Sequence, residues 1–417
     1  MKLSSIFAAG LLMGLTGLTA CTASQRGETQ EQVSTNPGSE QSQPSEQASS
    51  QTTQAQQVAL NRTCNLVEQG YGPSGQIPIR VEEVVSGLDV PWGMAFLPNG
   101  DMLVTERAGQ VRLVRQGQLR SQPVATIAAT DEGEGGLLGI AVHPDVGSNR
   151  FFYVYYTANR NGTPTNLVER WRLSEDGLSA TRDRTILDGI PVAQYHNGGR
   201  IRFGPDGMLY IGTGDARDPD TSQDLDNLAG KILRVTPEGE VPSDNPFPGN
   251  PAYILGIRNT QGFDWIDAST LWVTDHGPSG ELGRRGHDKA SVARAGDNLG
   301  WPIQERCESA EGLVTPSMVW RQALPPGGSV IYTGSAIPEW RNSLIIATLR
   351  SEHLQRVAFD PNSPGQVQRH EVYLEGEYGR LRDAVMGPDG ELYVTTSNCD
   401  GRGSCPAEKD KILRITR

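Results

Sequence analysis

The segment "RIRFGPDGMLYIGTGD", residues 200–215, joins a short apolar stretch to an alternating one through a Gly-Pro-Asp-Gly turn. The same order returns at 383–398, as "DAVMGPDGELYVTTSN". Turn residues of this kind between two such stretches are typical of β-hairpins. The sequence therefore predicts a fold that repeats one hairpin unit.

Four further copies of the hairpin complete the series. Two are clear, at 92–107 and 139–157, and two are weaker, at 262–277 and 337–350. The six turns fall near residues 99, 144, 206, 268, 342 and 389. Because the repeat is large, is made of strands and has no helical half, it predicts an all-β fold, a six-bladed β-propeller. A large β-sandwich with similar hairpins is the alternative.

The composition narrows the class of protein. Of 417 residues, 49 are Gly and 27 are Pro, which predicts many turns and short strands. Lys and Arg number 37 against 49 Asp and Glu, a formal net charge of −12. This charge argues for solubility and against nucleic-acid binding, which requires a basic surface.

The N-terminus has the features of an export signal. An apolar stretch at 6–18 follows an N-terminal lysine, which suits a secretory signal peptide and is too short to span a bilayer. It ends in "LTAC" at 18–21, which resembles the lipobox of bacterial lipoproteins. We therefore expect a lipoprotein signal peptide over 1–20 and a lipid anchor on Cys21. Ordinary signal cleavage that leaves Cys21 a free thiol is the alternative.

Residues 21–60 are expected to form a disordered tether. They are rich in Ser, Gln and Thr, and they hold too few large apolar side chains to offset the entropy of ordering. The propeller domain is then expected over 61–417. Together these features predict an exported protein that is lipid-anchored to a bacterial membrane, with its domain in the periplasm or at the cell surface.

Four cysteines remain beyond Cys21, and an even number in an exported chain favours disulfides. Cys399 and Cys405 enclose the short loop "DGRGS", which favours a disulfide between them. Cys64 with Cys307 follows only by elimination. A zinc site is the alternative, although no CxxC or HxxxH spacing supports it.

Charged and polar residues gather in a few segments beside the predicted strands. His196 lies in "YHNGGR", and Arg258 and Asn259 lie in "LGIRNTQGF". Arg380 and Arg382 alternate in "GRLRD", so that both side chains leave the same face of an extended segment. A propeller binds its ligand at the mouth of the central channel, on loops between strands, and we expect these residues to meet there.

An ordered series of motifs over about residues 80–417 resembles the glucose/sorbosone dehydrogenase family. The series runs "GEGGLLGIAVHPD", "YHNGGRIRFGPDG", "LGIRNTQGF", "DHGP", "GDNLGWP" and "GRLRDAVMGPDG". The resemblance implies a six-bladed propeller that uses pyrroloquinoline quinone (PQQ) and Ca²⁺. It also implies oxidation of an aldose sugar at C1 to the lactone, with electrons passed to a quinone or a redox protein.

The same resemblance implies the catalytic roles. His196 matches the general base that takes the proton of the anomeric hydroxyl while hydride passes to C5 of PQQ. A histidine suits this because its ordinary pKa lies near neutrality. Arg258 matches the cation beside the C5 oxygen, where negative charge develops, and Asn259 its hydrogen-bonding neighbour.

Further positions of the family motif are implied to bind PQQ. Arg380 and Arg382 match paired arginines, which suit a flat tricarboxylate through their planar forks. Arg350 stands where some members carry lysine. Gln223 matches a polar position with a supporting part in cofactor binding.

Metal and substrate positions follow in the same way. The backbone carbonyls of Gly277 and Pro278 match those that hold the Ca²⁺, an ion that accepts carbonyl ligands readily. Glu134 stands where glucose-oxidising relatives place a glutamine near the sugar, so it is expected to contact substrate.

The sequence departs from the family pattern after "DHGP". Lys289 and Ser291 replace an acid and an amide there, which argues against a second calcium site in that segment. The departure also keeps open a second function, that of a non-catalytic cell-surface propeller that binds carbohydrate or protein. Retention of His196 together with Arg258, Arg380 and Arg382 favours the enzyme.

Overall fold

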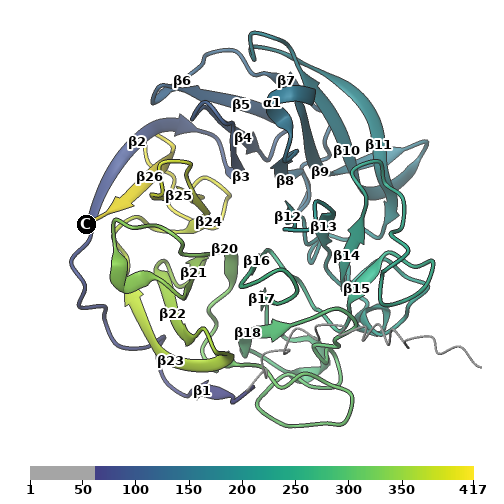
Figure 1. Ribbon diagram of the computed structural model, residues 1–417, viewed down its shortest axis with the longest axis vertical. Helices are drawn as coiled ribbons and strands as arrows, with labels where there is room; N and C mark the ends of the chain where they lie inside the picture. The colour runs from purple at the N-terminus through teal and green to yellow at the C-terminus, as the bar shows by residue number, and fades with distance from the viewer. Residues whose placement is uncertain (1–61) are drawn as a thin grey trace, which may run out of the picture. The chain divides into compact units, whose positions relative to one another are not determined.

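Residues 62–417 form a ring of six β-sheets in the computed structural model, which describes this part of the chain (Figure 1). The predicted signal peptide over 1–20, the lipid anchor on Cys21 and the tether over 21–60 lie outside the described residues. The ring confirms the predicted six-bladed β-propeller. Among the helices of the described residues, none is long and apolar enough to cross a membrane.

Each of the first three blades begins with its inner strand (Figure 1). Blade one contains β3 (Pro91–Phe96), β4 (Met102–Glu106), β5 (Gln110–Arg115), β6 (Gln118–Leu119) and the short β7 (Ala125–Thr126). Blade two contains β8 (Leu137–Val142), α1 (Val146–Asn149), β9 (Phe151–Arg160), β10 (Thr163–Leu173) and β11 (Ala180–Ile190). Blade three contains β12 (Ile201–Phe203), β13 (Leu209–Gly212), η1 (Pro219–Ser222), β14 (Ile232–Val235) and β15 (Ala252–Ile254).

The other three blades follow the same plan. Blade four contains β16 (Gly262–Trp265), β17 (Leu271–Asp275), η2 (Glu281–Gly283), β18 (Asp288–Ala293) and β19 (Met318–Trp320). Blade five contains β20 (Pro326–Ile331), η3 (Pro338–Trp340), β21 (Ser343–Thr348), β22 (Leu354–Asp360) and β23 (Ser363–Tyr373). Blade six contains β24 (Leu381–Met386), β25 (Leu392–Thr396), β26 (Asp410–Thr416) and an N-terminal strand, β2 (Arg80–Leu88).

Two N-terminal strands close and brace the ring. Strand β2 pairs antiparallel with β26, so that the two ends of the domain share blade six. Strand β1 (Asn65–Val67) adds in parallel to the outer edge of blade four, beside β19. A disulfide joins Cys64, next to β1, to Cys307 in the same blade. A second disulfide joins Cys399 to Cys405, so both predicted pairings are present.

The prediction of a hairpin at 337–350 is wrong for its first strand. Its first predicted strand is the 3₁₀ helix η3, and the inner strand of blade five lies earlier, at β20. Pro338 has no backbone N–H for a strand ladder and sits instead at the start of the helix. Trp340 is then buried between Tyr332 and Tyr373.

The hydrophobic core lies between neighbouring blades. Leu103 and Leu113 of blade one pack with Phe152 and Leu167 of blade two, all without solvent exposure. Burying one such side chain contributes about 1.5–3 kcal/mol. Each sheet is therefore held by its neighbours on both sides, and the loops at the ends of the strands are left to carry the site.

Antiparallel pairing brings two loops of each blade together. The residues before an inner strand and those after the second strand lie at the same end of the paired strands. In blade three Ile201 lies opposite Ile211, and in blade six Leu381 lies opposite Thr396. The segments at 195–200 and 213–216 therefore adjoin each other, as do those at 379–380 and 397–402.

Candidate active site

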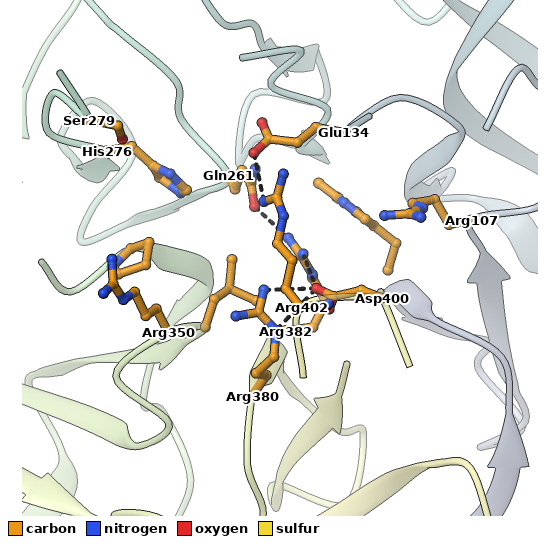
Figure 2. A pocket seen from close by; sticks show the side chains of 13 residues that line it. Arg107, Glu134, Gln261, His276, Ser279, Arg350, Arg380, Arg382, Asp400 and Arg402 are labelled. Atoms are coloured by element: carbon orange, nitrogen blue, oxygen red, sulfur yellow. Dashed lines mark hydrogen bonds and ion pairs between the residues drawn. The ribbon is translucent and has the colours of Figure 1, made fainter. Parts of the chain in front are cut away.

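A cavity of about 370 Å³ opens beside the segments at 379–380 and 397–402, whereas the segments at 195–200 and 213–216 do not line it (Figure 2). This volume lies in the range of small-molecule sites. The cavity is lined by Trp92, Arg107, Glu134, Gln261, His276, Ser279, Pro325, Leu349, Arg350, Arg380, Arg382, Asp400 and Arg402. Of the residues predicted from the sequence, Glu134, Arg350, Arg380 and Arg382 therefore meet here.

The cavity is strongly cationic although the chain is acidic. Five arginines line it against two carboxylates, so cations exceed anions by three. A chain with a formal net charge of −12 thus concentrates positive charge in one place. Arginine forks bind carboxylates in a planar, bidentate manner. This lining favours a flat ligand that carries several carboxylates.

Arg382 is the most deeply placed of these cations. Its Nη1 donates to Gln261 Oε1 at 2.6 Å, and its guanidinium lies 5.6 Å from the Trp92 ring. Arg382 Nη2 lies 3.9 Å from Asp400 Oδ2. The buried Arg382 Nε has no hydrogen-bond partner among the described residues. Burial lowers the pKa of Arg382 to about 9, which Asp400 opposes. An anion bound beside Arg382 would stabilise its charged form.

Arg380 and Arg350 complete the cationic wall. Arg380 donates to Asp400 Oδ2 from Nε at 3.1 Å and from Nη2 at 2.7 Å. Arg350 follows β21 and is exposed at the cavity. Figure 2 shows Arg350 and Arg380 reaching the cavity from different segments of the chain. A ligand between them would be held from more than one blade.

His196 is held by a carboxylate that the sequence did not single out. Its Nδ1 lies 2.7 Å from Asp215 Oδ1, and Trp301 Nε1 donates to Asp215 Oδ2 at 2.9 Å. Asp215 has no solvent exposure. An ionised carboxylate accepts a hydrogen bond from Nδ1–H, and that tautomer places the imidazole lone pair on Nε2. This is the form that a general base requires.

The backbone around His196 depends on a glycine in the facing loop. His196 has φ of 65°, in the left-handed region. A Cβ at Gly214 would lie 2.0 Å from the His196 carbonyl oxygen. Only glycine permits the two loops to approach this closely.

Gly214→Ala is expected to displace the His196 loop, to reduce activity and to destabilise the fold by about 1–3 kcal/mol through overpacking. Urea denaturation and turnover assays measure the two effects. Gly147→Ala is the control, because a Cβ there meets no atom within 4 Å. Equal stability and activity of both variants would contradict this account.

Arg258 and Asn259 are fixed by their own backbone. Both N–H groups donate to the buried Asp275 carboxylate, that of Asn259 at 2.7 Å. Arg258 Nη2 donates to Ser279 Oγ at 3.4 Å, and Ser279 lines the cavity. Asn259 Oδ1 accepts from the Gly198 N–H at 2.9 Å, which ties this turn to the His196 loop.

Lys289, the departure from the family pattern, is part of the same support. Its Nζ lies 3.7 Å from Asp275 and 3.3 Å from the Leu299 carbonyl oxygen, with the side chain buried. Burial lowers the pKa of Lys289, and Asp275 opposes this. The lysine at 289 therefore neutralises Asp275, the carboxylate to which the backbone of Arg258 and Asn259 is hydrogen-bonded.

The segment that was expected to hold calcium begins the loop between β17 and β18. Gly277 N–H donates to Asp288 Oδ1 at 2.9 Å, and the Pro278 carbonyl accepts from Gly286 N–H at 2.9 Å. Among residues 62–417, no group of three or more His, Cys, Asp and Glu side chains could hold a metal ion. An ion here would rely on backbone carbonyls, and that of Pro278 already accepts one hydrogen bond.

Gln223 does not line the cavity. Its Nε2 donates to the Trp301 carbonyl at 2.6 Å and to Asn298 Oδ1 at 3.1 Å. The side chain thereby fixes the loop that carries Trp301, which in turn contacts Asp215. Its part in the site is support for this loop.

His276 lines the cavity as a neutral ring. Its Nε2 lies 2.7 Å from the Pro326 carbonyl, which can only accept, so Nε2 carries the proton. Burial lowers the pKa of His276 to about 3, which Glu134 opposes. The ring therefore stays uncharged at neutral pH.

His276 is expected to make the fold less stable as the pH falls. Below about pH 6.5 the unfolded imidazole binds a proton that the folded one refuses until about pH 3, so stability decreases by up to about 1.4 kcal/mol per pH unit. In His276→Gln this part of the slope is lost. Urea denaturation between pH 7 and 5 measures it, and equal slopes would contradict the assignment.

Several residues of the site lacked a signal in the sequence. Asp215, Gln261, Trp301 and Asp400 lie within or beside the quoted motifs, but no residue pattern gave them a role. Asp215 lies three residues after the second strand of its hairpin, and Asp275 is the last residue of the second strand in the next blade. Attention to acidic residues at or shortly after the ends of second strands would have found both.

Comparison with known proteins places the chain among sugar dehydrogenases. A family model described as Glucose / Sorbosone dehydrogenase matches residues 88–413. An aldose sugar dehydrogenase of Escherichia coli is 33% identical over 349 residues, 78% of this chain and 91% of the relative. Quinoprotein glucose dehydrogenase B of Acinetobacter calcoaceticus is 25% identical over 409 residues, 75% of this chain and 84% of the relative. The PQQ-bound structure of an aldose sugar dehydrogenase from Streptomyces coelicolor has a TM-score of 0.73 and 37% identity, and covers 83% of this chain and 99% of its own.

Proposed function

The chain belongs to the glucose/sorbosone dehydrogenase family, and from this premise we propose that it is a PQQ-dependent dehydrogenase that oxidises aldose sugars at C1 to the lactone. The observation that carries the proposal is the cavity lining, whose cations exceed its carboxylates by three. PQQ is a tricarboxylate, so its negative charge complements this excess of cations. The relatives named above include a PQQ-bound aldose sugar dehydrogenase.

The residues present fit PQQ in a second respect. Arg382 Nε and Asn259 Nδ2 are buried and have no hydrogen-bond partner among the described residues. Buried donors of this kind cost about 1–3 kcal/mol each when unpaired. Arg382 lines the cavity, so a ligand there that is rich in carboxylate and carbonyl oxygens would supply an acceptor for its Nε. Arg350, Arg380 and Arg382 would hold its carboxylates.

The protein residues perform the proton chemistry. The chemistry supplied by bound PQQ is acceptance of a hydride from the sugar C1. His196 Nε2 takes the proton of the anomeric hydroxyl, which leaves the C1 carbonyl of the lactone. Asp215 keeps the imidazole oriented and stabilises its cationic form after the transfer. Arg258 presents a fixed cation, which stabilises negative charge that develops beside it.

Calcium is part of the proposal, with the carbonyl oxygens of Gly277 and Pro278 as its protein ligands. These oxygens suit a hard cation, and bound Ca²⁺ would act as a Lewis acid. Removing calcium with EGTA is expected to abolish dye-coupled turnover, and adding CaCl₂ with PQQ to restore it. Turnover that survives exhaustive chelation would contradict this metal site.

We further propose that the domain acts outside the cytoplasm, on a membrane to which Cys21 anchors it. The proposal rests on the signal-like segment at 1–20 and on the two disulfides, which persist in oxidising compartments. A quinone or a redox protein would receive the electrons. Labelling with a radioactive fatty acid, compared between the wild-type chain and Cys21→Ser, tests the anchor.

Reconstitution tests the activity. The purified chain, loaded with PQQ and Ca²⁺, is expected to reduce a redox dye when an aldose is added, and to do so in proportion to bound PQQ. A panel of hexoses and pentoses covers the substrate class. A chain that binds PQQ but oxidises no aldose would contradict the proposed reaction.

A further inference from the structure

The loop between Cys399 and Cys405 forms part of the cavity wall. The disulfide closes this loop on itself, and both Asp400 and Arg402 line the cavity. Asp400 accepts two hydrogen bonds from Arg380 and a third from the Arg402 N–H at 2.9 Å. The loop is therefore attached at its base to an arginine of the cationic wall.

Arg402 crosses from this loop to another blade. Its Nη1 donates to Glu134 Oε1 at 3.0 Å, and Glu134 lies just before β8 of blade two (Figure 2). The other oxygen of Glu134 accepts from the His196 N–H at 3.0 Å. The side chains of Arg402 and Glu134 are 46% and 21% exposed, so the pair lies at the accessible edge of the site.

Three kinds of sugar-binding surface meet at this point. Arg402 supplies hydrogen-bond donors, Glu134 supplies acceptors, and the Tyr195 ring lies 5.7 Å from the Arg402 guanidinium. Vicinal hydroxyls both donate and accept, and aromatic rings pack against the apolar face of a sugar. The pair is also next to the backbone of His196, the proposed base.

We propose that Arg402 completes the sugar subsite beside the expected substrate contact Glu134, that the pair selects neutral aldoses over sugar acids, and that the Cys399–Cys405 loop positions Arg402 for this task. The inference rests on the proposed function. Its basis is local charge balance, because Arg402 pairs with Glu134, whereas Arg380 and Arg382 share the single carboxylate of Asp400 and Arg350 also lines the cavity as a cation. The remaining lining arginine, Arg107, is paired with Asp131 at 2.7 Å. A carboxylate on the sugar would thus face Glu134 without a cation of its own.

Arg402→Ala tests the contact. Loss of a charged hydrogen bond to the sugar is expected to raise KM for glucose about tenfold or more. The Kd for PQQ, measured by titration of its absorbance, is expected to stay near the wild-type value, because Arg380 and Arg382 are untouched. Unchanged KM for glucose would overturn the inference.

The charges of Arg402 and Glu134 are tested through the preference for a neutral over an acidic sugar. A residue that only supports the fold would not change this preference. The ratio of kcat/KM for glucose to that for glucuronic acid is measured in two variants. Glu134→Gln leaves Arg402 without its carboxylate and is expected to lower this ratio about tenfold, whereas Arg402→Ala leaves the carboxylate alone and is expected to raise it. Shifts in the same direction would overturn the inference.

The positioning role of the Cys399–Cys405 disulfide is tested with two double variants, each of which removes one disulfide. Replacing both Cys399 and Cys405 with Ser is expected to raise KM for glucose in the same direction as Arg402→Ala, with a smaller factor. Replacing both Cys64 and Cys307 with Ser removes the other disulfide, which lies outside the cavity lining, and is expected to leave KM unchanged. Equal KM values for the two double variants would overturn the positioning role of the loop.

Failure of the inference is distinguishable from failure of the proposed function. A wild-type chain that neither binds PQQ nor oxidises aldoses removes the premise. A wild-type chain that does both, with the variants showing the wild-type KM and the wild-type ratio, overturns the sugar subsite alone.

Discussion

His196→Gln is expected to lower kcat by about 10²–10⁴-fold, the contribution of a positioned general base. The amide cannot take a proton at neutral pH, although its size lets it occupy much of the same space beside Asp215. The Kd for PQQ is expected to change little, since the cofactor carboxylates are assigned to the arginines. Dye-coupled turnover gives the first quantity and titration with PQQ the second.

Asp215→Asn is the control for orientation. The asparagine amide can donate to Nδ1 and so favours the tautomer with the proton on Nε2, which cannot act as a base. A loss of about 10²–10⁴-fold in kcat is expected, by analogy with the serine protease triad. Wild-type turnover in His196→Gln would place the base on another residue.

Arg382→Met is expected to weaken PQQ binding by about 10²–10³-fold, because it removes a buried cation from a carboxylate partner. Methionine retains much of the volume beside Trp92 and Gln261, so the change is chiefly one of charge. Once PQQ saturates the variant, kcat is expected to recover in large part. Equilibrium titration with PQQ measures the effect.

Arg356→Met is the matched control. Arg356 is also a buried arginine, paired with Glu371 at 2.6 Å, but it lies on β22 and does not line the cavity. Its loss is expected to lower the free energy of unfolding and to leave the PQQ affinity as it is. A similar loss of affinity in both variants would mean that Arg382 acts through stability rather than through contact.

The fold could be predicted because most of the blades carry their own local signal. The Gly-Pro-Asp-Gly turns at 204–207 and 387–390 set the hairpin and the pleat of its strands. Blade five has no such turn between β20 and β21, and its inner strand was missed. Ring closure by β2 and the added strand β1 were missed for another reason. Their partners β26 and β19 are hundreds of residues away, and no local pattern specifies a long-range partner.

The site was predictable only where the family resemblance supplied roles. The resemblance named His196 and the arginines, but it did not name the groups that hold them. Asp215 faces His196 because β12 pairs with β13 in a particular register, and Asp400 faces Arg380 because β24 pairs with β25. These contacts depend on three-dimensional pairing, which the residue types alone do not encode.

The charge excess of the cavity is likewise a property of the fold. Arg107, Arg350 and Arg382 come from three different blades, and Gln223 stands outside the lining although its motif placed it at the cofactor. In the sequence these arginines are spread through an acidic chain. Only the ring of blades gathers them around one volume.

Calorimetric titration of the purified chain with PQQ, in the presence of Ca²⁺, tests the central claim most directly. The account predicts one tight site per chain, weakened by added salt and by Arg382→Met, and no comparable binding of the PQQ trimethyl ester, which lacks the three carboxylates. Absence of PQQ binding, or equal affinity for PQQ and the ester, would contradict it.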